Sequence, residues 1–207
     1  MFSTIPPATR ALIVANVVIW LLEPVARGFA IGLFGLWPLG PLFHPWQVVT
    51  YAFLHAPLSG PNGFTHIFFN MFALYMFGGA LENYWGTLRF LLYYFASVLA
   101  AAGTELLVLS QSQAVEPVIG ASGGIFGLLL GFAWYFPQQR LMLLFPPIPM
   151  PAWLFVTLYG ALELFLGVTG AEAGVAHFAH LGGMLGGAIM ILLWRAEDSG
   201  RHRRRRF

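Results

Sequence analysis

The chain contains no cysteine, no lysine and few charged residues of any kind. The missing cysteines exclude disulfide bonds, thiolate metal sites and cysteine nucleophiles. Charged residues make up only 9% of the 207 residues, whereas about a quarter is typical of a soluble domain. Hydrophobic residues make up 58%, and the mean hydropathy is +0.75. So apolar a chain would expose large adhesive patches in water, and the composition therefore favours a protein of the lipid bilayer.

Hydrophobic runs long enough to cross a membrane recur along the sequence. A helix rises about 1.5 Å per residue, so roughly 20 residues cross the hydrocarbon core of a bilayer. We predict an all-α polytopic membrane bundle with six spans, at about 10–25, 65–85, 88–109, 120–137, 151–168 and 174–194. The fourth span should end at Pro137, because proline breaks a helix. These spans fit one membrane domain over residues 1–195, followed by a basic tail at 196–207.

The positions of the arginines predict the orientation of the spans. If the N-terminus is inside, nine of the ten arginines face the cytoplasm and only Arg27 lies outside. Positive residues are retained on the cytoplasmic side of a membrane, so we expect both termini there. The arginine-rich tail is also compatible with nucleic-acid binding. Because the tail directly follows a span, a cytoplasmic anchor is the better interpretation, and we expect no nucleic-acid partner.

Two features predict how the spans are arranged. The long connection at about 26–64 is rich in glycine, proline and aromatic residues. Aromatic residues concentrate at the membrane–water interface, so we expect this outer loop to lie partly within it. Spans four and six both carry glycines at small-xxx-small spacing, which lets helices approach closely in lipid. We therefore expect spans four and six to touch.

The residues Gly120–Gly124 form a G-x-S-x-G pattern at the predicted start of the fourth span. In soluble hydrolases this pattern joins a strand to a helix, but no strand is predicted here and that fold is not implied. A serine at a helix start lies beside unpaired backbone N–H groups, which can stabilise a developing oxyanion. Ser122 is therefore a candidate nucleophile. Considered alone, the pattern is more typical of a serine that eases helix packing.

A histidine inside a span is costly to bury and is a functional candidate by default. His180 lies fifteen residues before Arg195, and Ser122 lies fifteen residues before Pro137. Both are thus about 22 Å from the cytoplasmic ends of their spans, roughly 8 Å below the outer surface. A shared depth on touching helices meets the requirement of a nucleophile paired with a general base. The alternative is a histidine that only hydrogen-bonds between helices.

His66 and Asn70 extend the pattern, because residues four apart share one face of a helix. Asn70 lies fifteen residues before Trp85, which places it level with Ser122, and His66 lies one turn nearer the outside. An amide and an imidazole beside a serine can donate hydrogen bonds to an oxyanion. Phe126 lies one turn beyond Ser122, where it can stack on an imidazole. The alternative for the polar pair is mutual bonding between helices.

No aspartate is available to complete a Ser-His-Asp triad. The only aspartate is Asp198, in the tail. Glu105, Glu116 and Glu172 lie near the outer side, at depths that do not match the candidate site. We therefore predict a Ser-His dyad, in which His180 is oriented by packing and not by a carboxylate.

Five motifs carry one resemblance, which runs over about residues 8–195. They are Gly120–Gly127 (GASGGIFG), His66-x-x-x-Asn70, Ala179–Gly183 (AHLGG), Gly78–Glu82 (GGALE) and Trp46–His55 (WQVVTYAFLH). The set resembles the rhomboid family of intramembrane serine proteases, here in its bacterial, six-span form. The resemblance implies a rhomboid bundle with a long interfacial first loop and a serine endopeptidase that uses no cofactor.

The resemblance also implies roles for individual residues. Ser122 is expected to attack the scissile carbonyl and His180 to take its proton, with His66, Asn70 and the Ser122 backbone N–H as the oxyanion hole. The residues expected to support the dyad are Phe126, Gly120 and Gly123. The implied substrates are single-span membrane proteins, cut within or near the outer part of their spans after lateral entry near spans two and five. The compact form favours a bacterial inner membrane.

Two departures from the family pattern concern the outer loop. The family often has Trp-Arg where this chain has Trp46-Gln47, which predicts weaker anchoring of the loop to lipid headgroups. The stretch Pro57–Gly63 looks inserted ahead of the second span. Neither departure touches the candidate catalytic residues.

Three alternatives to a protease remain. His177 and His180 are three apart, with His66 in possible reach, and zinc sites use such histidines. No glutamate is placed as a third ligand, so we expect no metal. A non-catalytic relative that escorts membrane proteins should lack the serine or the histidine, and this chain keeps both. A transporter should carry more intramembrane charge or broken helices in paired repeats, and the sequence has neither.

Overall fold

The computed structural model describes residues 5–26, 28–60, 62–111, 116–142, 147–170 and 175–204, with side chains described as far as Glu197. Within this part of the chain five helical segments are long and apolar enough to cross a membrane. They are α1 (Pro7–Ala26), the continuous segment Gly63–Trp85, α6 (Thr87–Leu109), α8 (Ala152–Thr169) and the membrane part of α9 (His177–Arg204). The predicted all-α membrane bundle is confirmed.

The remaining predicted span is shorter than the five others. α7 (Ser122–Tyr135) has 14 residues, which at about 1.5 Å per residue is shorter than a bilayer core of roughly 30 Å. It is shorter than the predicted 120–137 because an irregular segment leads into Ser122 and the helix ends before Pro137. α9 differs in the other direction, since it continues to Arg204 beyond the predicted end near residue 194.

The segment Gly63–Trp85 is helical throughout but not uniform. α4 (Gly63–Ala73) and α5 (Gly79–Trp85) are joined by the π-helical turn η2 (Leu74–Gly78). Such a turn widens the helix locally and is common at functional sites. η2 lies directly beside the candidate site.

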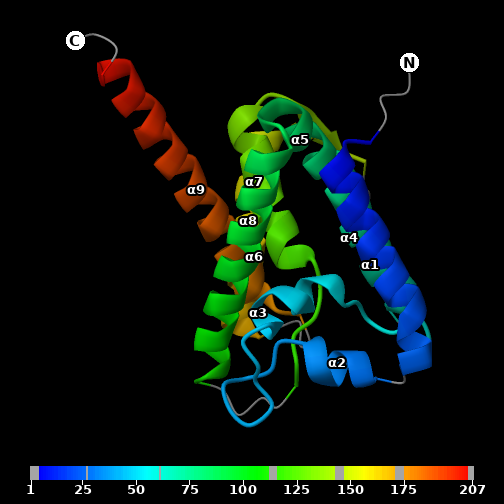
Figure 1. The fold of residues 1–207 in the computed structure, drawn as a ribbon. Helices are drawn as coiled ribbons and strands as arrows, with labels where there is room; N and C mark the ends of the chain where they lie inside the picture. The colour runs from blue at the N-terminus through cyan, green and yellow to red at the C-terminus, as the bar shows by residue number, and fades with distance from the viewer. Residues whose placement is uncertain are drawn as a thin grey trace.

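Shorter elements lie outside the long helices. The first loop contains α2 (Phe29–Phe34), α3 (Gln47–Thr50) and the 3₁₀ turn η1 (Tyr51–Phe53), and β1 (Arg140–Met142) pairs with β2 (Pro149–Pro151) in an antiparallel hairpin. α2 and α3 lie at one end of the bundle, while α1 begins and α9 ends at the other (Figure 1). The first loop therefore lies on the opposite side of the bundle from the start of α1 and the end of α9.

α9 packs most extensively against α6 and α7. The closest approach joins the backbones of Gly123 in α7 and Gly183 in α9, where any side chain on Gly183 would overlap the carbonyl of Gly123. The predicted contact between spans four and six is confirmed. Small residues allow it because dispersion between close backbones, and not the hydrophobic effect, joins helices in lipid.

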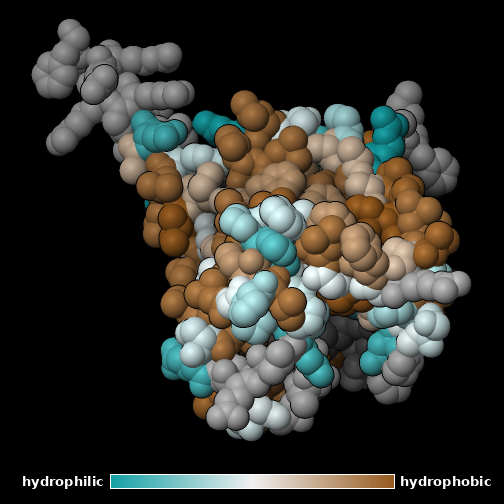
Figure 2. All heavy atoms as spheres, turned by 60° about the horizontal axis from the view of Figure 1, so that its bottom comes forward, coloured by the Kyte–Doolittle hydropathy of each residue, from teal (hydrophilic) through white to brown (hydrophobic). Residues whose placement is uncertain are grey.

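α8 is packed far less tightly than α9. Only Ala152, Val156 and Glu163 of its 18 residues are buried, and most of its large apolar side chains face outward. Apolar residues also cover much of the visible surface of the whole molecule (Figure 2). Because a surface of this kind is stable only in hydrocarbon, the protein is an integral membrane protein.

A buried glutamate joins the start of α1 to the end of the second span. Glu82 accepts hydrogen bonds from the backbone N–H groups of Ala8 and Thr9, at 2.9 and 2.7 Å, and from the hydroxyls of Thr9 and Thr87, both at 2.8 Å. A carboxylate at a helix N-terminus satisfies N–H groups that have no partner within the helix. Glu82 therefore stabilises the fold at the end of the bundle away from the first loop.

Gln47 has a different role from the one expected. It is fully buried, its amide donates to the carbonyls of Leu33 and Leu42, and its side-chain oxygen accepts from the N–H of Trp37. The expectation of weak anchoring to headgroups assumed an outward-facing residue, and it does not apply to a buried amide. Gln47 holds the first loop together from within.

Candidate active site

Ser122 and His180 are hydrogen-bonded to each other. The Oγ of Ser122, at the first residue of α7, lies 2.8 Å from the Nε2 of His180, in the first turn of α9. The close packing of Gly123 against Gly183 sets the two helices at the distance that permits this bond. The structure thus brings together the two residues that the sequence placed at one depth.

Phe126 packs against one face of the His180 imidazole. Its ring stacks on that of His180, with centroids 4.2 Å apart and planes inclined by only 8°. Phe126 also contacts Tyr159 of α8, at 5.0 Å between centroids. The stacking that the one-turn spacing from Ser122 predicted is thus present, and it restricts rotation of the imidazole.

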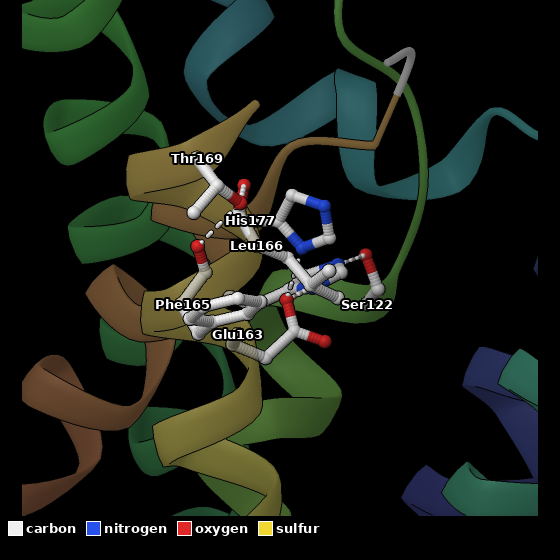
Figure 3. Close-up of polar contacts among 7 residues, drawn as sticks. Ser122, Glu163, Phe165, Leu166, Thr169 and His177 are labelled. Atoms are coloured by element: carbon white, nitrogen blue, oxygen red, sulfur yellow. Dashed lines mark hydrogen bonds and ion pairs between the residues drawn. The ribbon is translucent and has the colours of Figure 1, made fainter. Parts of the chain in front are cut away.

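A carboxylate reaches the far side of the same imidazole. The Oε2 of Glu163 lies 2.8 Å from the Nδ1 of His180 and 2.7 Å from the Nδ1 of His177 (Figure 3). The prediction that His180 is oriented by packing alone is therefore wrong. Of the acids considered from the sequence, Glu105 is buried on α6 beside Ala179 and His177, Glu116 is exposed, and Glu172 lies outside the described residues.

The sequence did carry a signal for Glu163. An acidic residue in the middle of an apolar span is rare and marks a functional site by default. Glu163 lies twelve residues after Pro151, the start of the predicted span, which is about 18 Å from its inner end. That is within one helical turn of the depth assigned to Ser122 and His180. The same depth comparison, applied to the fifth span, would have found it.

Glu163, His177 and His180 also form a group that is able to hold a metal ion. One ligand atom from each lies within 4.8 Å of the others, and all three residues are buried. The ground on which the sequence argued against a metal, the lack of a nearby glutamate, is therefore wrong. In the structure the three ligand atoms are joined by hydrogen bonds, with the carboxylate oxygen as shared acceptor.

Asn70 and His66 lie beside Ser122, on α4. The amide of Asn70 donates to the carbonyl of His66 at 2.8 Å and borders the cavity that contains Ser122 and His180. The Nδ1 of His66 accepts from the N–H of Ala56 at 3.2 Å, so its proton is on Nε2. This Nε2 faces Gly120, where a Cβ atom would be 3.0 Å away.

Gly120 and Gly123 are required by their surroundings. Gly120 has φ +130°, a conformation that other residues rarely adopt, and its N–H donates to the carbonyl of Tyr51 at 3.0 Å. A Cβ atom on Gly123 would lie 2.5 Å from that of Ala101. Both glycines thus let the chain before and after Ser122 approach its neighbours.

A second histidine packs behind His66. His55, in the loop before α4, is buried, and its ring lies 5.1 Å from that of His66. Burial, together with the nearby His66, lowers the pKa of His55 from 6.5 to about 3. His55 therefore adds no positive charge beside the site at neutral pH.

A cavity of about 720 Å³ opens from the Ser-His pair. Residues of α4, η2, α7 and α8 form its walls, and residues of β1 and β2 also line it. Apart from Ser122, His180, Asn70 and Tyr159, its lining is apolar, and residues from these walls include Phe72, Ala73, Met76, Leu141, Met150, Phe155 and Leu158. The cavity thus connects the pair with the gap between two membrane-spanning helices.

Comparison with known proteins agrees with this arrangement. The profile of the Rhomboid domain matches residues 42–197. The chain belongs to the rhomboid family. It is 27% identical to the mitochondrial rhomboid protein 1 of Saccharomyces cerevisiae over 91% of the chain and 56% of that protein. It is 30% identical to the rhomboid protease GluP of Bacillus subtilis over 69% of the chain and 24% of that protein.

A third relative extends over nearly the whole chain. The rhomboid protease GlpG of Yersinia pestis is 25% identical over 94% of the chain and 65% of the relative. The aligned region therefore spans from about a quarter to two thirds of the length of these rhomboid proteins.

Proposed function

We propose that this rhomboid-family protein is an intramembrane serine endopeptidase that cleaves single-span membrane proteins. The observation that carries the proposal is the 2.8 Å hydrogen bond from Ser122 Oγ to His180 Nε2, at the wall of an apolar cavity between membrane-spanning helices. A nucleophile bonded to a base that is itself oriented by a third group is the common arrangement of covalent hydrolases.

The geometry supports a two-step reaction. As Ser122 Oγ bonds to the scissile carbonyl carbon, its proton moves to His180 Nε2 and the carbonyl electron pair moves onto the oxygen. His180 then gives that proton to the nitrogen of the leaving amine as the C–N bond breaks. Water, activated by the same imidazole, releases the acyl group from Ser122. This chemistry requires no cofactor.

Three donors are available for the oxyanion. The Nε2–H of His66 faces the Gly120–Ser122 segment, and Asn70 has a second amide hydrogen beyond the one bonded to His66. The backbone N–H of Ser122 belongs to the first turn of α7, where helical N–H groups lack partners. Each such donor contributes about 10²–10³ in kcat in serine hydrolases.

The cavity between α4 and α8 provides a lateral route for substrate. Val118 pairs with Leu36, and the N–H of Gly120 donates to the carbonyl of Tyr51, so the chain that leads into Ser122 lies against the first loop, on the side that holds α2 and α3. We assign this side to the outside and both termini to the cytoplasm of a bacterial inner membrane. Residues 1–195 then form the catalytic domain and 196–207 a basic cytoplasmic tail. Cleavage should fall in the outer part of the substrate's span.

The test is cleavage of a model single-span substrate in liposomes, together with labelling by a fluorophosphonate probe. Ser122→Ala should abolish both, and His180→Ala should lower both by at least about 10³-fold. Full cleavage by Ser122→Ala would overturn the proposal.

Two further outcomes concern the metal alternative and the oxyanion hole. Wild-type activity that is lost in a chelator and restored by zinc would favour a metal-dependent hydrolase. His66→Ala and Asn70→Ala should each lower turnover, and unchanged turnover in both would remove them from the oxyanion hole.

A further inference from the structure

A continuous hydrogen-bonded chain runs from Ser122 through His180 to a carboxylate on another helix. Ser122 Oγ and Glu163 Oε2 are each 2.8 Å from opposite ring nitrogens of His180. Glu163 is only 4% exposed. These hydrogen bonds therefore join α7, α9 and α8 inside the protein, where charges are poorly screened.

We propose that Glu163 is a positioning residue that fixes the tautomer of His180, so that the Ser-His pair acts as a Ser122–His180–Glu163 relay. This inference rests on the proposed function of Ser122 and His180. A carboxylate can only accept hydrogen bonds, so Nδ1 of His180 must carry the proton. Nε2 is then left with a lone pair, which is what a base for the Ser122 hydroxyl requires.

His177 contacts the same carboxylate oxygen from a second side. It donates from its own Nδ1 to the same Oε2 of Glu163, at 2.7 Å. Two N–H groups thus fix the position of one carboxylate oxygen beside Nδ1 of His180. A protonated Glu163 would instead donate to Nδ1 of His180 and place the proton on Nε2, where it would block transfer from Ser122.

The carboxylate also offsets a charge that forms during the reaction. When His180 takes the proton of Ser122, a buried imidazolium is created, which is costly without a partner. Glu163 is in contact with that imidazolium through Nδ1 and needs no proton transfer of its own. The proton stays on His180 until the leaving amine takes it.

The competing explanation is structural. Glu163 is one of three buried residues of α8, and its bonds to two histidines of α9 join these helices. If joining helices is the whole role, substitution of Glu163 should reduce the fraction of folded enzyme and leave the rate of each folded site unchanged. The relay predicts instead that the rate of each folded site falls.

The experiment compares Glu163→Gln with Glu82→Gln, the same change at a buried carboxylate far from Ser122. Glu163→Gln should lower kcat by about 10²–10⁴ with little change in KM, and should slow fluorophosphonate labelling while the end-point stoichiometry stays near one. Glu82→Gln should lower the melting temperature, because four hydrogen bonds weaken, and keep the wild-type rate per labelled site.

A third variant separates the two bonds of Glu163. His177→Gln leaves the bond between Glu163 and His180 in place, so its rate per labelled site should stay within about tenfold of wild type, whereas the loss in Glu163→Gln should be far larger. A loss per site in His177→Gln equal to that in Glu163→Gln would overturn the relay in favour of a structural cluster.

The remaining outcomes distinguish the two proposals. If wild type does not label, the serine hydrolase itself fails. If wild type labels and Glu163→Gln labels at the same rate per site, only the relay is overturned. Loss of wild-type labelling in chelator, restored by zinc, would assign Glu163, His177 and His180 to a metal and would also overturn the relay.

Discussion

Single atoms decide the geometry around Ser122. At Gly120 one added methyl group would lie 3.0 Å from His66 Nε2, and the backbone there has φ +130°. At Gly103, within α6, the same methyl group would meet nothing within 4 Å. Substitution of glycine by alanine is therefore expected to disturb the structure at Gly120 and to be tolerated at Gly103.

We predict that Gly120→Ala lowers the rate of substrate cleavage per folded site by at least about tenfold and lowers the melting temperature. A left-handed or similarly strained residue costs of order 1–3 kcal/mol, and relief of that strain would displace His66 or Ser122. Gly103→Ala, the matched control, should keep the wild-type rate. Rates are normalised to probe-labelled sites, and equal rates in the two variants would contradict the role given to Gly120.

At the scale of residues, the sequence predicts how deep a side chain lies in the membrane, but it does not predict which neighbouring helix that side chain points toward. Ser122 and His180 were predicted to lie at one depth because each helical residue adds a fixed rise along the helix axis. Phe126 followed from the one-turn spacing. The contact between Glu163 and His180 was not predicted. In a helix surrounded by lipid all faces are apolar, so the sequence pattern does not say which face meets a neighbour.

The long helices and the short elements differ in how far their sequences specify them. α1 and α6 lie within three residues of their predicted bounds, because a long apolar run has one stable arrangement in a bilayer. α2, α3 and the hairpin of β1 and β2 were not predicted. Such short elements depend on tertiary contacts, like those that Gln47 makes within the first loop, which the local sequence does not reveal.

The loop between η1 and α4 makes stability depend on pH. We predict that the free energy of unfolding falls as the pH decreases below 6.5, by up to about 1.4 kcal/mol per pH unit from His55 alone. The pKa of His55 is about 3 in the folded protein, so between pH 6.5 and 3 the unfolded chain binds a proton that the folded protein does not. His55 thus contributes stability that is present above pH 6.5 and lost toward pH 3.

Thermal unfolding in detergent at several pH values measures this effect. His55→Leu should have a shallower dependence of stability on pH in this range, even if its stability at neutral pH differs from wild type. An unchanged slope in His55→Leu would show that other groups carry the effect.

At the scale of the whole molecule, the cavity separates small reagents from membrane-spanning substrates. We predict that Ala73→Trp, which fills the cavity wall on α4, lowers cleavage of a single-span substrate by at least about tenfold. Labelling by a small fluorophosphonate should stay within about twofold of wild type, because the probe does not need the lateral route. Ala11→Trp, on an exposed part of α1, is the control and should affect neither.

The two assays must be run on the same preparations. Equal losses of cleavage and labelling in Ala73→Trp would mean that the tryptophan distorts Ser122 itself. Unchanged cleavage would mean that substrate reaches the serine from another side.

The sparse packing of α8 links access to chemistry. One wall of the cavity is a helix whose inward anchors are Ala152, Val156 and Glu163, and the last of these also bonds His180. An outward swing of α8 at this level, wide enough to admit a substrate, would withdraw the carboxylate from the imidazole. Such a swing would leave His180, the base, without its positioning carboxylate, and the Ser-His pair would regain that carboxylate only when α8 packs back against α9.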